Sequence, residues 1–185
     1  MNFLKAQVNP HFLFNTLNNL YGLILHKRAD ASAETVTRLS DYMRYSLENA
    51  NKKSILLSDE IALINNYIEL ESLRLNHTKV VFTTNVDASN LSLPPLLFIP
   101  LIENAFKYNI DKKDTVLSIN LNLDNTDLQL HIENTFDENS AKNEINGLGL
   151  SNLKKRLNLY YADAYQYNVA IDNSVYKVSL KLILV

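Results

Sequence analysis

The chain has 185 residues, of which 46% are hydrophobic and 21% are charged, and its formal net charge is −2. A chain of this size suits one medium domain, or a small helical unit joined to a domain of ordinary size. The near-neutral charge gives no support to a nucleic-acid or anionic-membrane partner. Because there is no cysteine, disulfides, thiolate metal sites and cysteine nucleophiles are excluded. No signal-peptide pattern and no apolar run long enough to cross a bilayer occurs in these residues.

The first segment predicts a helix over residues 3–28 with one apolar and one polar stripe. Both stripes repeat with 4-3-4 spacing, which is typical of a helix. The apolar stripe consists of Leu13, Leu17, Leu20 and Ile24, and the polar stripe of His11, Asn15, Asn18 and Gly22. Pro10 is expected either to kink this helix or to mark a helix start just before His11.

A second helix is predicted after a connection at residues 28–32, and it extends to about Asn49. The two helices form a hairpin. A lone hairpin cannot bury both of its apolar stripes, so a second copy of the chain is expected to complete a dimeric four-helix bundle. The polar segment at residues 49–54 then marks the domain boundary.

The rest of the chain predicts an α+β domain with a mostly antiparallel sheet covered by helices on one face. Residues 55–57 favour a short strand, and Ser58 is the expected N-cap of a helix with Asp59 and Glu60 in its first turn. Strands are predicted at 80–84, 117–123, 128–132, 167–171 and 176–184, with turns at 124–127 and 172–174, and helices at about 101–108 and 150–160.

His11 is the first candidate for chemistry, because neutral imidazole is nucleophilic near pH 7 and can attack a γ-phosphate. On spacing alone, a surface or capping histidine is the favoured interpretation. The stretch from Gln7 to Asn15, which reads Gln-Val-Asn-Pro-His-Phe-Leu-Phe-Asn, resembles the phosphoacceptor box of LytS/YehU-type sensor histidine kinases almost letter for letter. Further landmarks of that family follow downstream, at Leu57-Ser-Asp-Glu60, Tyr67, Glu69, Arg74 and Pro95.

That resemblance implies a GHKL-type, α/β-sandwich ATP-binding domain with two more boxes. Residues 100–108 resemble the superfamily's N box, which implies that the amide oxygen of Asn104 binds Mg²⁺, that Lys107 reaches a phosphate and that Tyr108 lines the nucleotide. Without the family, this segment is an amphipathic helix with ordinary polar residues. Gly147 and Gly149 resemble the last glycine box, whose backbone N–H groups turn toward an anion at a helix N-terminus, although Gly-x-Gly alone equally describes a simple turn.

Two departures from the superfamily stand out. Most members carry an Asp-x-Gly-x-Gly box whose aspartate accepts a hydrogen bond from the adenine amino group, whereas this chain has Asn134 at or beside that position and no glycine nearby. The amide oxygen of Asn134 is expected to accept the same bond without the charge, and residues 136–146 are expected to form the ATP lid. Many histidine kinases also place an acidic residue directly after the histidine, where this chain has Phe12.

The resemblance assigns residues 1–53 to a dimerisation and phosphotransfer hairpin and residues 54–185 to a catalytic ATP-binding domain. It implies an enzyme that uses ATP and Mg²⁺ to phosphorylate His11 and then a response-regulator aspartate, in a regulator that often carries a LytTR domain. Asn15 is expected to support phosphatase activity, or else to cap the helix at Pro10 or bond across the dimer. The parent is expected to be an inner-membrane protein, anchored by a segment before this cytoplasmic portion. The alternative is a non-catalytic phosphotransfer or scaffold dimer with a decayed ATP module.

Overall fold

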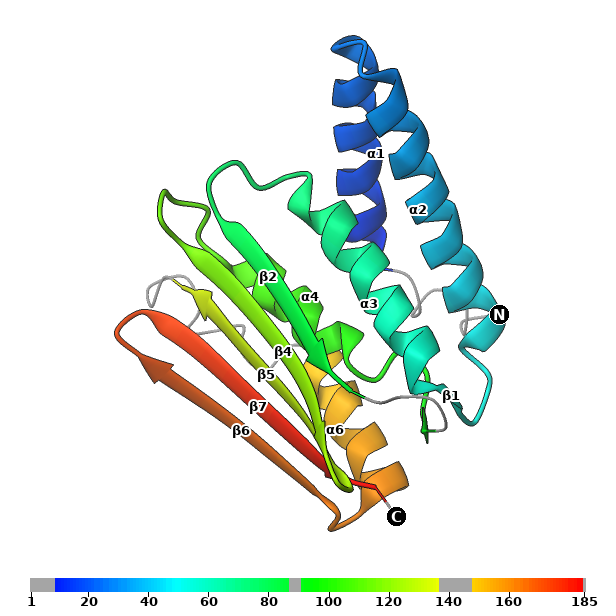
Figure 1. Ribbon diagram of the computed structural model, residues 1–185, viewed down its shortest axis with the longest axis vertical. Helices are drawn as coiled ribbons and strands as arrows, with labels where there is room; N and C mark the ends of the chain where they lie inside the picture. Colours follow the sequence, from blue (N-terminus) through cyan, green and yellow to red (C-terminus); the bar gives the residue numbers. More distant parts are fainter. Residues whose placement is uncertain (1–8, 87–90, 137–147, 185) are drawn as a thin grey trace. The chain divides into compact units, whose positions relative to one another are not determined.

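The computed structural model describes residues 9–86, 91–136 and 148–184, and the contacts within it divide the chain into two compact units (Figure 1). One unit comprises Met1–Asn76 with Ser89–Leu96, and the other comprises His77–Ala88 with Leu97–Val185. No helix in the described part of the chain has the length and apolar character needed to span a bilayer. These units are defined by their internal contacts and do not test the predicted boundary at residue 53 between a phosphotransfer hairpin and an ATP-binding domain. That boundary stays a prediction.

The first unit is built on three helices, α1 (Pro10–Leu25), α2 (Ala29–Asn49) and α3 (Leu57–Ser72). The antiparallel strands β1 (Ile55–Leu56) and β3 (Ser92–Leu93) complete it. The predicted hairpin of α1 and α2 is confirmed, and its connection is short. Small hydroxyl residues are buried on both helices, and each bonds to the carbonyl one turn back in its own helix, which satisfies its hydroxyl without a partner from another helix. These residues are Thr16, Thr35 and Ser46.

Helix α1 begins at Pro10, so the proline marks a start. Proline suits the first helical position because its missing N–H would have no acceptor there. Asn9 is the N-cap, and its Oδ1 accepts a hydrogen bond from the backbone N–H of His11 at 3.0 Å. Residues 3–8 of the predicted longer helix lie outside the described residues.

The prediction that Ser58 caps α3 is wrong. The helix begins one residue earlier, at Leu57, and its N-cap Leu56 makes no side-chain capping bond. Leu57 is fully buried, and its N–H donates to the carbonyl of Leu91 at 2.8 Å. The neighbouring β3 segment therefore satisfies a helix N-terminal N–H that a serine hydroxyl was expected to satisfy.

The second unit is a five-stranded sheet with helices on one face, as the sequence predicted (Figure 1). The strands lie in the order β2 (Lys79–Asn85), β4 (Val116–Asp124), β5 (Asp127–Thr135), β7 (Val175–Ile183) and β6 (Tyr165–Asp172). Only the β2–β4 pair is parallel among the described strands. The covering helices are α4 (Ile99–Tyr108) and α6 (Leu148–Tyr161).

The sheet owes its core to strict alternation on its three central strands. Leu121, Leu130 and Leu180 are aligned across β4, β5 and β7, and all three are fully buried. Every second residue along the middle of these strands is therefore buried, as expected for a sheet that is covered on one face only. The predicted turn between β6 and β7 contains Asn173 and Ser174 with φ of 48° and 60°. Positive φ at both positions matches the twist of the flanking strands.

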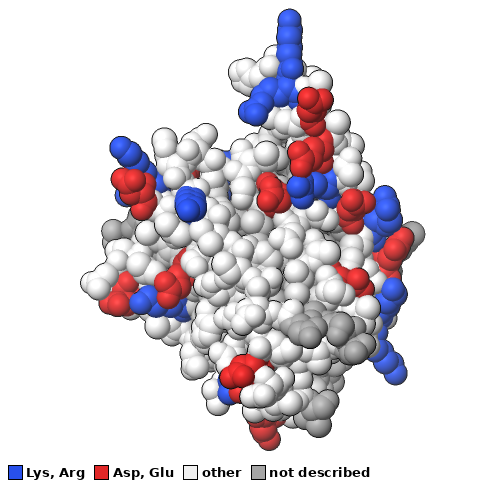
Figure 2. All heavy atoms as spheres, viewed as in Figure 1, with Lys and Arg blue, Asp and Glu red and all other residues white. Residues whose placement is uncertain are grey.

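The surface carries lysine and arginine interspersed with aspartate and glutamate on the face shown in Figure 2. Helix α1 differs from this mixed surface because it exposes a row of large apolar side chains. They are Phe14, Leu17, Tyr21, Ile24 and Leu25. The row includes Leu17 and Ile24 of the predicted apolar stripe, whereas the other two members, Leu13 and Leu20, are half-buried, so the stripe is only partly covered within one chain.

Candidate active site

His11 lies in the first turn of α1 and is exposed to solvent. Asn15 follows one helical turn later, and its Nδ2 lies 3.2 Å from Nδ1 and 3.4 Å from Nε2 of the His11 ring. Residues four apart on a helix share a face, so the backbone itself brings these two side chains together. Asn9, and not Asn15, supplies the helix cap, and the Asn15 amide contacts the imidazole instead.

This pair places a neutral amide beside the ring of His11. The amide Nδ2 lies within hydrogen-bond distance of both ring nitrogens, and which of them takes part depends on the tautomer of the ring. The contact orients the ring without adding a charge beside it. The geometry of His11 and Asn15 therefore fits an oriented, solvent-exposed imidazole.

Phe12 is buried although its neighbour His11 is exposed. Its ring stacks on Tyr67 of α3, with 4.8 Å between ring centroids, and tilts against Tyr42 of α2 at 4.9 Å. The sequence identified Phe12 only as the residue that replaces an acid, and it missed this packing role. The sequence offers one indication, because Phe12 and Thr16 are four residues apart and therefore share one face of α1. In the structure that face is turned toward the other helices.

Helix α4 holds the second set of candidates. Its apolar side is buried and consists of Ile99, Leu101, Ile102, Ala105 and Phe106. Asn104 and Tyr108 are half-buried, and Lys107 is exposed. The ammonium of Lys107 donates to the hydroxyl of Tyr108 at 2.9 Å and lies 4.7 Å from the centroid of its ring. The lysine is thus held near the end of the helix, where its positive charge also suits the helix dipole.

The end of α4 is tied to the end of β5. The N–H of Ile110 donates to the carbonyl of Thr135 at 3.0 Å, and the Thr135 hydroxyl donates to Asn109 Oδ1 at 3.3 Å. These bonds fix α4 beside Asn134, the residue before Thr135 on the covered face of β5. The structure therefore brings the candidates of α4 and β5 into one region of the second unit.

Asn134 is fully buried and incompletely bonded. Its Nδ2 donates to the carbonyl of Thr135 at 3.1 Å, whereas its Oδ1 has no hydrogen-bond partner within the described part of the chain. Buried polar atoms almost always have a partner, and an unsatisfied one costs about 1–3 kcal/mol. The remaining residues of this row on β5 are apolar, so the free oxygen is a fixed acceptor in an otherwise apolar wall.

Two aromatic residues that sequence reasoning missed border Asn134. Tyr176 is its direct cross-strand partner on β7, and the Tyr176 ring lies 5.9 Å from that of Phe136. Burial raises the pKa of Tyr176, and the nearby Tyr108 raises it further, so the wall stays neutral. A neutral aromatic wall with one directed acceptor suits a flat heterocycle that carries an amino group. In the sequence, Tyr176 looked like any other buried position of an alternating strand.

The glycine box is only partly described. Gly149 is the second residue of α6, so its N–H belongs to the first turn, where no intrahelical acceptor exists. It has no positive φ, and an added Cβ would meet nothing within 4 Å, so the helix itself does not require glycine here. Gly147 and residues 137–146 of the predicted lid lie outside the described residues.

Comparisons with known proteins agree with this geometry. A family model described as histidine kinase matches residues 1–79. The sensor histidine kinase BtsS of Escherichia coli K12 is 31% identical over 183 residues, which covers 97% of this chain and 32% of BtsS. The sensor protein LytS of Bacillus subtilis is 33% identical over 118 residues, covering 63% of this chain and 20% of LytS.

The chain belongs to the LytS-type sensor histidine kinases. The histidine kinase AdeS of Acinetobacter baumannii shares the fold, with a TM-score of 0.51 at 15% identity over 94% of this chain and 95% of that one. This LytS-type core spans about a third of the length of BtsS. The α+β architecture with a mostly antiparallel sheet is thus the expected fold of the family's core.

We expect replacement of Asn134 by leucine to leave the free energy of unfolding within about 1 kcal/mol of the wild type, because losing the bond to Thr135 is offset by removing an unsatisfied acceptor. Urea denaturation followed by circular dichroism measures the change. The matched control is Ile132→Asn on the same face of β5, which buries an amide among apolar neighbours and should cost about 3 kcal/mol. A loss of 2 kcal/mol or more in Asn134→Leu, taken as about twice the expected limit, would contradict the assignment of a free oxygen.

Proposed function

We propose that this chain uses ATP to phosphorylate His11 and then passes the phosphoryl group to an aspartate of a response regulator. The observation that carries the proposal is His11 itself, exposed in the first turn of α1 and contacted by the Asn15 amide, in a chain of the histidine kinase family. Residues 1–53 would serve as the dimerisation and phosphotransfer part, and residues 54–185 as the ATP-binding part.

In the proposed reaction, the unprotonated ring nitrogen of His11 attacks the γ-phosphorus of ATP. The bond from that phosphorus to the bridging oxygen breaks, and ADP leaves. The ring proton of the resulting phosphoimidazole can pass to solvent, so the attack needs no strong base. This is compatible with Phe12, a buried aromatic residue, standing where many kinases have an acid.

The described residues of the second unit fit ATP and Mg²⁺. Asn134 Oδ1 would accept a hydrogen bond from the adenine amino group, beside the rings of Tyr108 and Tyr176. Lys107 would reach a phosphate. The hard amide oxygen of Asn104 would contact the metal ion, which takes its other ligands from phosphates and water. The backbone N–H of Gly149 in the first turn of α6 would face the phosphates, and Gly147 of the same predicted glycine box lies outside the described residues.

The alternative is a scaffold dimer whose ATP module has decayed. The buried, unpartnered oxygen of Asn134 argues against decay, because a chain without a ligand gains nothing by keeping such an atom in an apolar wall. The apolar row of α1 supports a homodimer that buries it in a four-helix bundle. The regulator would be of the LytTR type, and this portion would lie in the cytoplasm beneath an inner-membrane anchor.

His11→Gln is expected to abolish acid-labile phosphate incorporation from labelled ATP, because glutamine offers no nucleophilic nitrogen at neutral pH. The measurement is incorporation of label into the purified chain. His26→Gln, at the end of the same helix, should incorporate label like the wild type. Label retained on His11→Gln at the wild-type level would refute the assignment.

Asn104→Ala is expected to abolish Mg·ATP binding with an unchanged circular dichroism spectrum. We expect a wild-type dissociation constant on the order of 0.1–1 mM, because a neutral amide in place of a carboxylate at the adenine costs roughly 1–2 kcal/mol. Isothermal titration measures both, with Asn122→Ala on the uncovered face of β4 as the control. A nanomolar wild-type constant would contradict the role given to Asn134, and unimpaired binding by Asn104→Ala would contradict the role given to Asn104.

Asn15→Ala is expected to slow dephosphorylation of the phosphorylated regulator and to spare most phosphorylation of His11. An amide one turn from His11 can orient a water for in-line attack on a phosphoaspartate without adding repulsive charge. The two rates are measured separately with labelled regulator and labelled ATP. Asn18→Ala, on the same polar stripe, is the control. If both rates fall together, Asn15 acts structurally, and if neither changes, its spacing from His11 is coincidental.

A further inference from the structure

The exposed nucleophile and a buried anchor are neighbours in the chain. His11 is in solvent, whereas the Phe12 ring is 1% exposed. Phe12, Tyr42 and Tyr67, here called the aromatic cluster, come from α1, α2 and α3, and the Tyr42 and Tyr67 rings lie 5.8 Å apart. Successive side chains on a helix point about 100° apart. A fixed direction for Phe12 therefore fixes the direction of His11.

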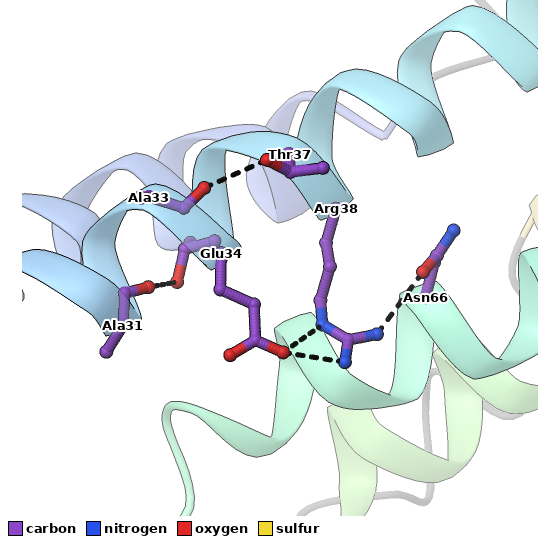
Figure 3. A network of polar contacts seen from close by, with 7 residues as sticks. Ala31, Ala33, Glu34, Thr37, Arg38 and Asn66 are labelled. Atoms are coloured by element: carbon purple, nitrogen blue, oxygen red, sulfur yellow. Dashed lines mark hydrogen bonds and ion pairs between the residues drawn. The ribbon is translucent and has the colours of Figure 1, made fainter.

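Helix α3 is joined to α2 by polar contacts at two points along its length. Arg38 of α2 donates to Glu34 Oε1 from Nε and Nη2 at 3.1 and 2.8 Å, and from Nη1 to Asn66 Oδ1 of α3 at 3.4 Å (Figure 3). Nearer the start of α3, the Tyr45 hydroxyl donates to Glu60 Oε2 at 3.5 Å. The pairing of Arg38 with Asn66 and of Tyr45 with Glu60 shows that α2 and α3 run antiparallel, and Tyr67 directly follows Asn66 in α3.

The first turn of α3 is also fixed by strand β3 and the chain that follows it. Glu60 is fully buried, and its Oε2 accepts a hydrogen bond from the Leu96 N–H at 2.8 Å. Strand β1, directly before α3, pairs with β3. Tyr67 is therefore a side chain on a firmly held helix, and it can act as a fixed wall for Phe12.

The first turn of α1 depends on such a wall. Its N–H groups have no intrahelical acceptors, and helix ends open more easily than helix centres. The Asn9 cap satisfies one of these groups, and Asn15 touches the His11 ring without joining it to another helix. Of the contacts described around residues 9–15, the aromatic cluster is the one that joins this turn to α3.

We propose that Tyr67 is a positioning residue for His11. Its ring holds Phe12 and thereby sets the direction in which α1 presents the imidazole to a phosphoryl donor. The inference rests on the proposed function, because it assumes that His11 accepts a phosphoryl group. Tyr67 contacts neither the donor nor the reacting atoms. Misplacing a reacting group by about 1 Å can cost on the order of a hundredfold in rate, so a shift of the first turn should be visible in kinetics.

The test uses the full chain and two phosphoryl donors. Phosphoramidate needs no nucleotide site, since its phosphorus–nitrogen bond breaks as the phosphorus–imidazole bond forms and ammonia leaves. Phosphoramidate diffuses freely to the exposed imidazole, so Tyr67→Leu should leave labelling of His11 by this donor within about twofold of the wild type. With ATP, which the protein would hold in place, Tyr67→Leu should lower kcat roughly tenfold while KM for ATP stays within about twofold. Tyr67→Phe keeps the stacked ring and should restore a rate close to the wild type.

The matched control is Leu57→Ala, a buried truncation on α3 that lies ten residues, or about 15 Å along the helix axis, from Tyr67. It should lower the melting temperature without slowing labelling. If Tyr67→Leu loses the wild-type circular dichroism spectrum, Phe12→Leu takes its place with the same expected result. Labelling of either folded variant by ATP at the wild-type rate, or equal slowing by Leu57→Ala, overturns the proposal. Labelling of the wild type by phosphoramidate but not by ATP would instead refute the proposed kinase function, and the positioning proposal with it.

Discussion

If His11 accepts a phosphoryl group, as proposed, the first turn of α1 has to expose its imidazole and still hold it in one direction. A helix terminus alone cannot do this, because its N–H groups lack partners and its side chains face solvent. Here the adjacent residue is buried instead, so that Phe12 packs on Tyr42 and Tyr67 while His11 points outward. Phe12 thus stands where many histidine kinases have an acidic residue, and its buried ring packs α1 against both α2 and α3.

A related constraint governs the second unit, where Oδ1 of Asn134 lies unpaired in an apolar wall and, under the proposed function, would bind adenine. Burying an unpaired carboxylate costs far more than burying an unpaired amide, because the charge loses its hydration. Asn134 therefore costs the ligand-free fold less than aspartate would, and in return it offers a weaker acceptor. Neutral surroundings match this choice, since burial keeps the Tyr176 hydroxyl protonated. The departure from the superfamily's aspartate is thus physically coherent with a working site of modest affinity.

Much of the fold could be predicted because it depends on local rules. Alternation located β4, β5 and β7, and turn residues located their hairpins. The Ser58 cap failed because a long-range bond from Leu57 to Leu91 replaced a local one. The aromatic cluster was missed for a similar reason: three residues 25–55 positions apart carry no periodic signal, and only packing unites them. The position of Tyr176 beside Asn134 could not be predicted, because in the alternating pattern of β7 it looks the same as a residue that only fills the core.

Helix α3 shows how packing can group residues that sequence composition separates. The polar segment at 49–54 suggests a boundary before α3, yet the helix buries Tyr67 against the hairpin and clusters with it, and the family model also extends past α3 to residue 79. The buried contact of Tyr67 with Phe12 attaches α3 to the hairpin. The Arg38–Asn66 contact reinforces that attachment only modestly, because it is partly exposed and long at 3.4 Å. The buried rings of Phe12, Tyr42 and Tyr67 therefore attach α3 to the hairpin more firmly than this polar contact does.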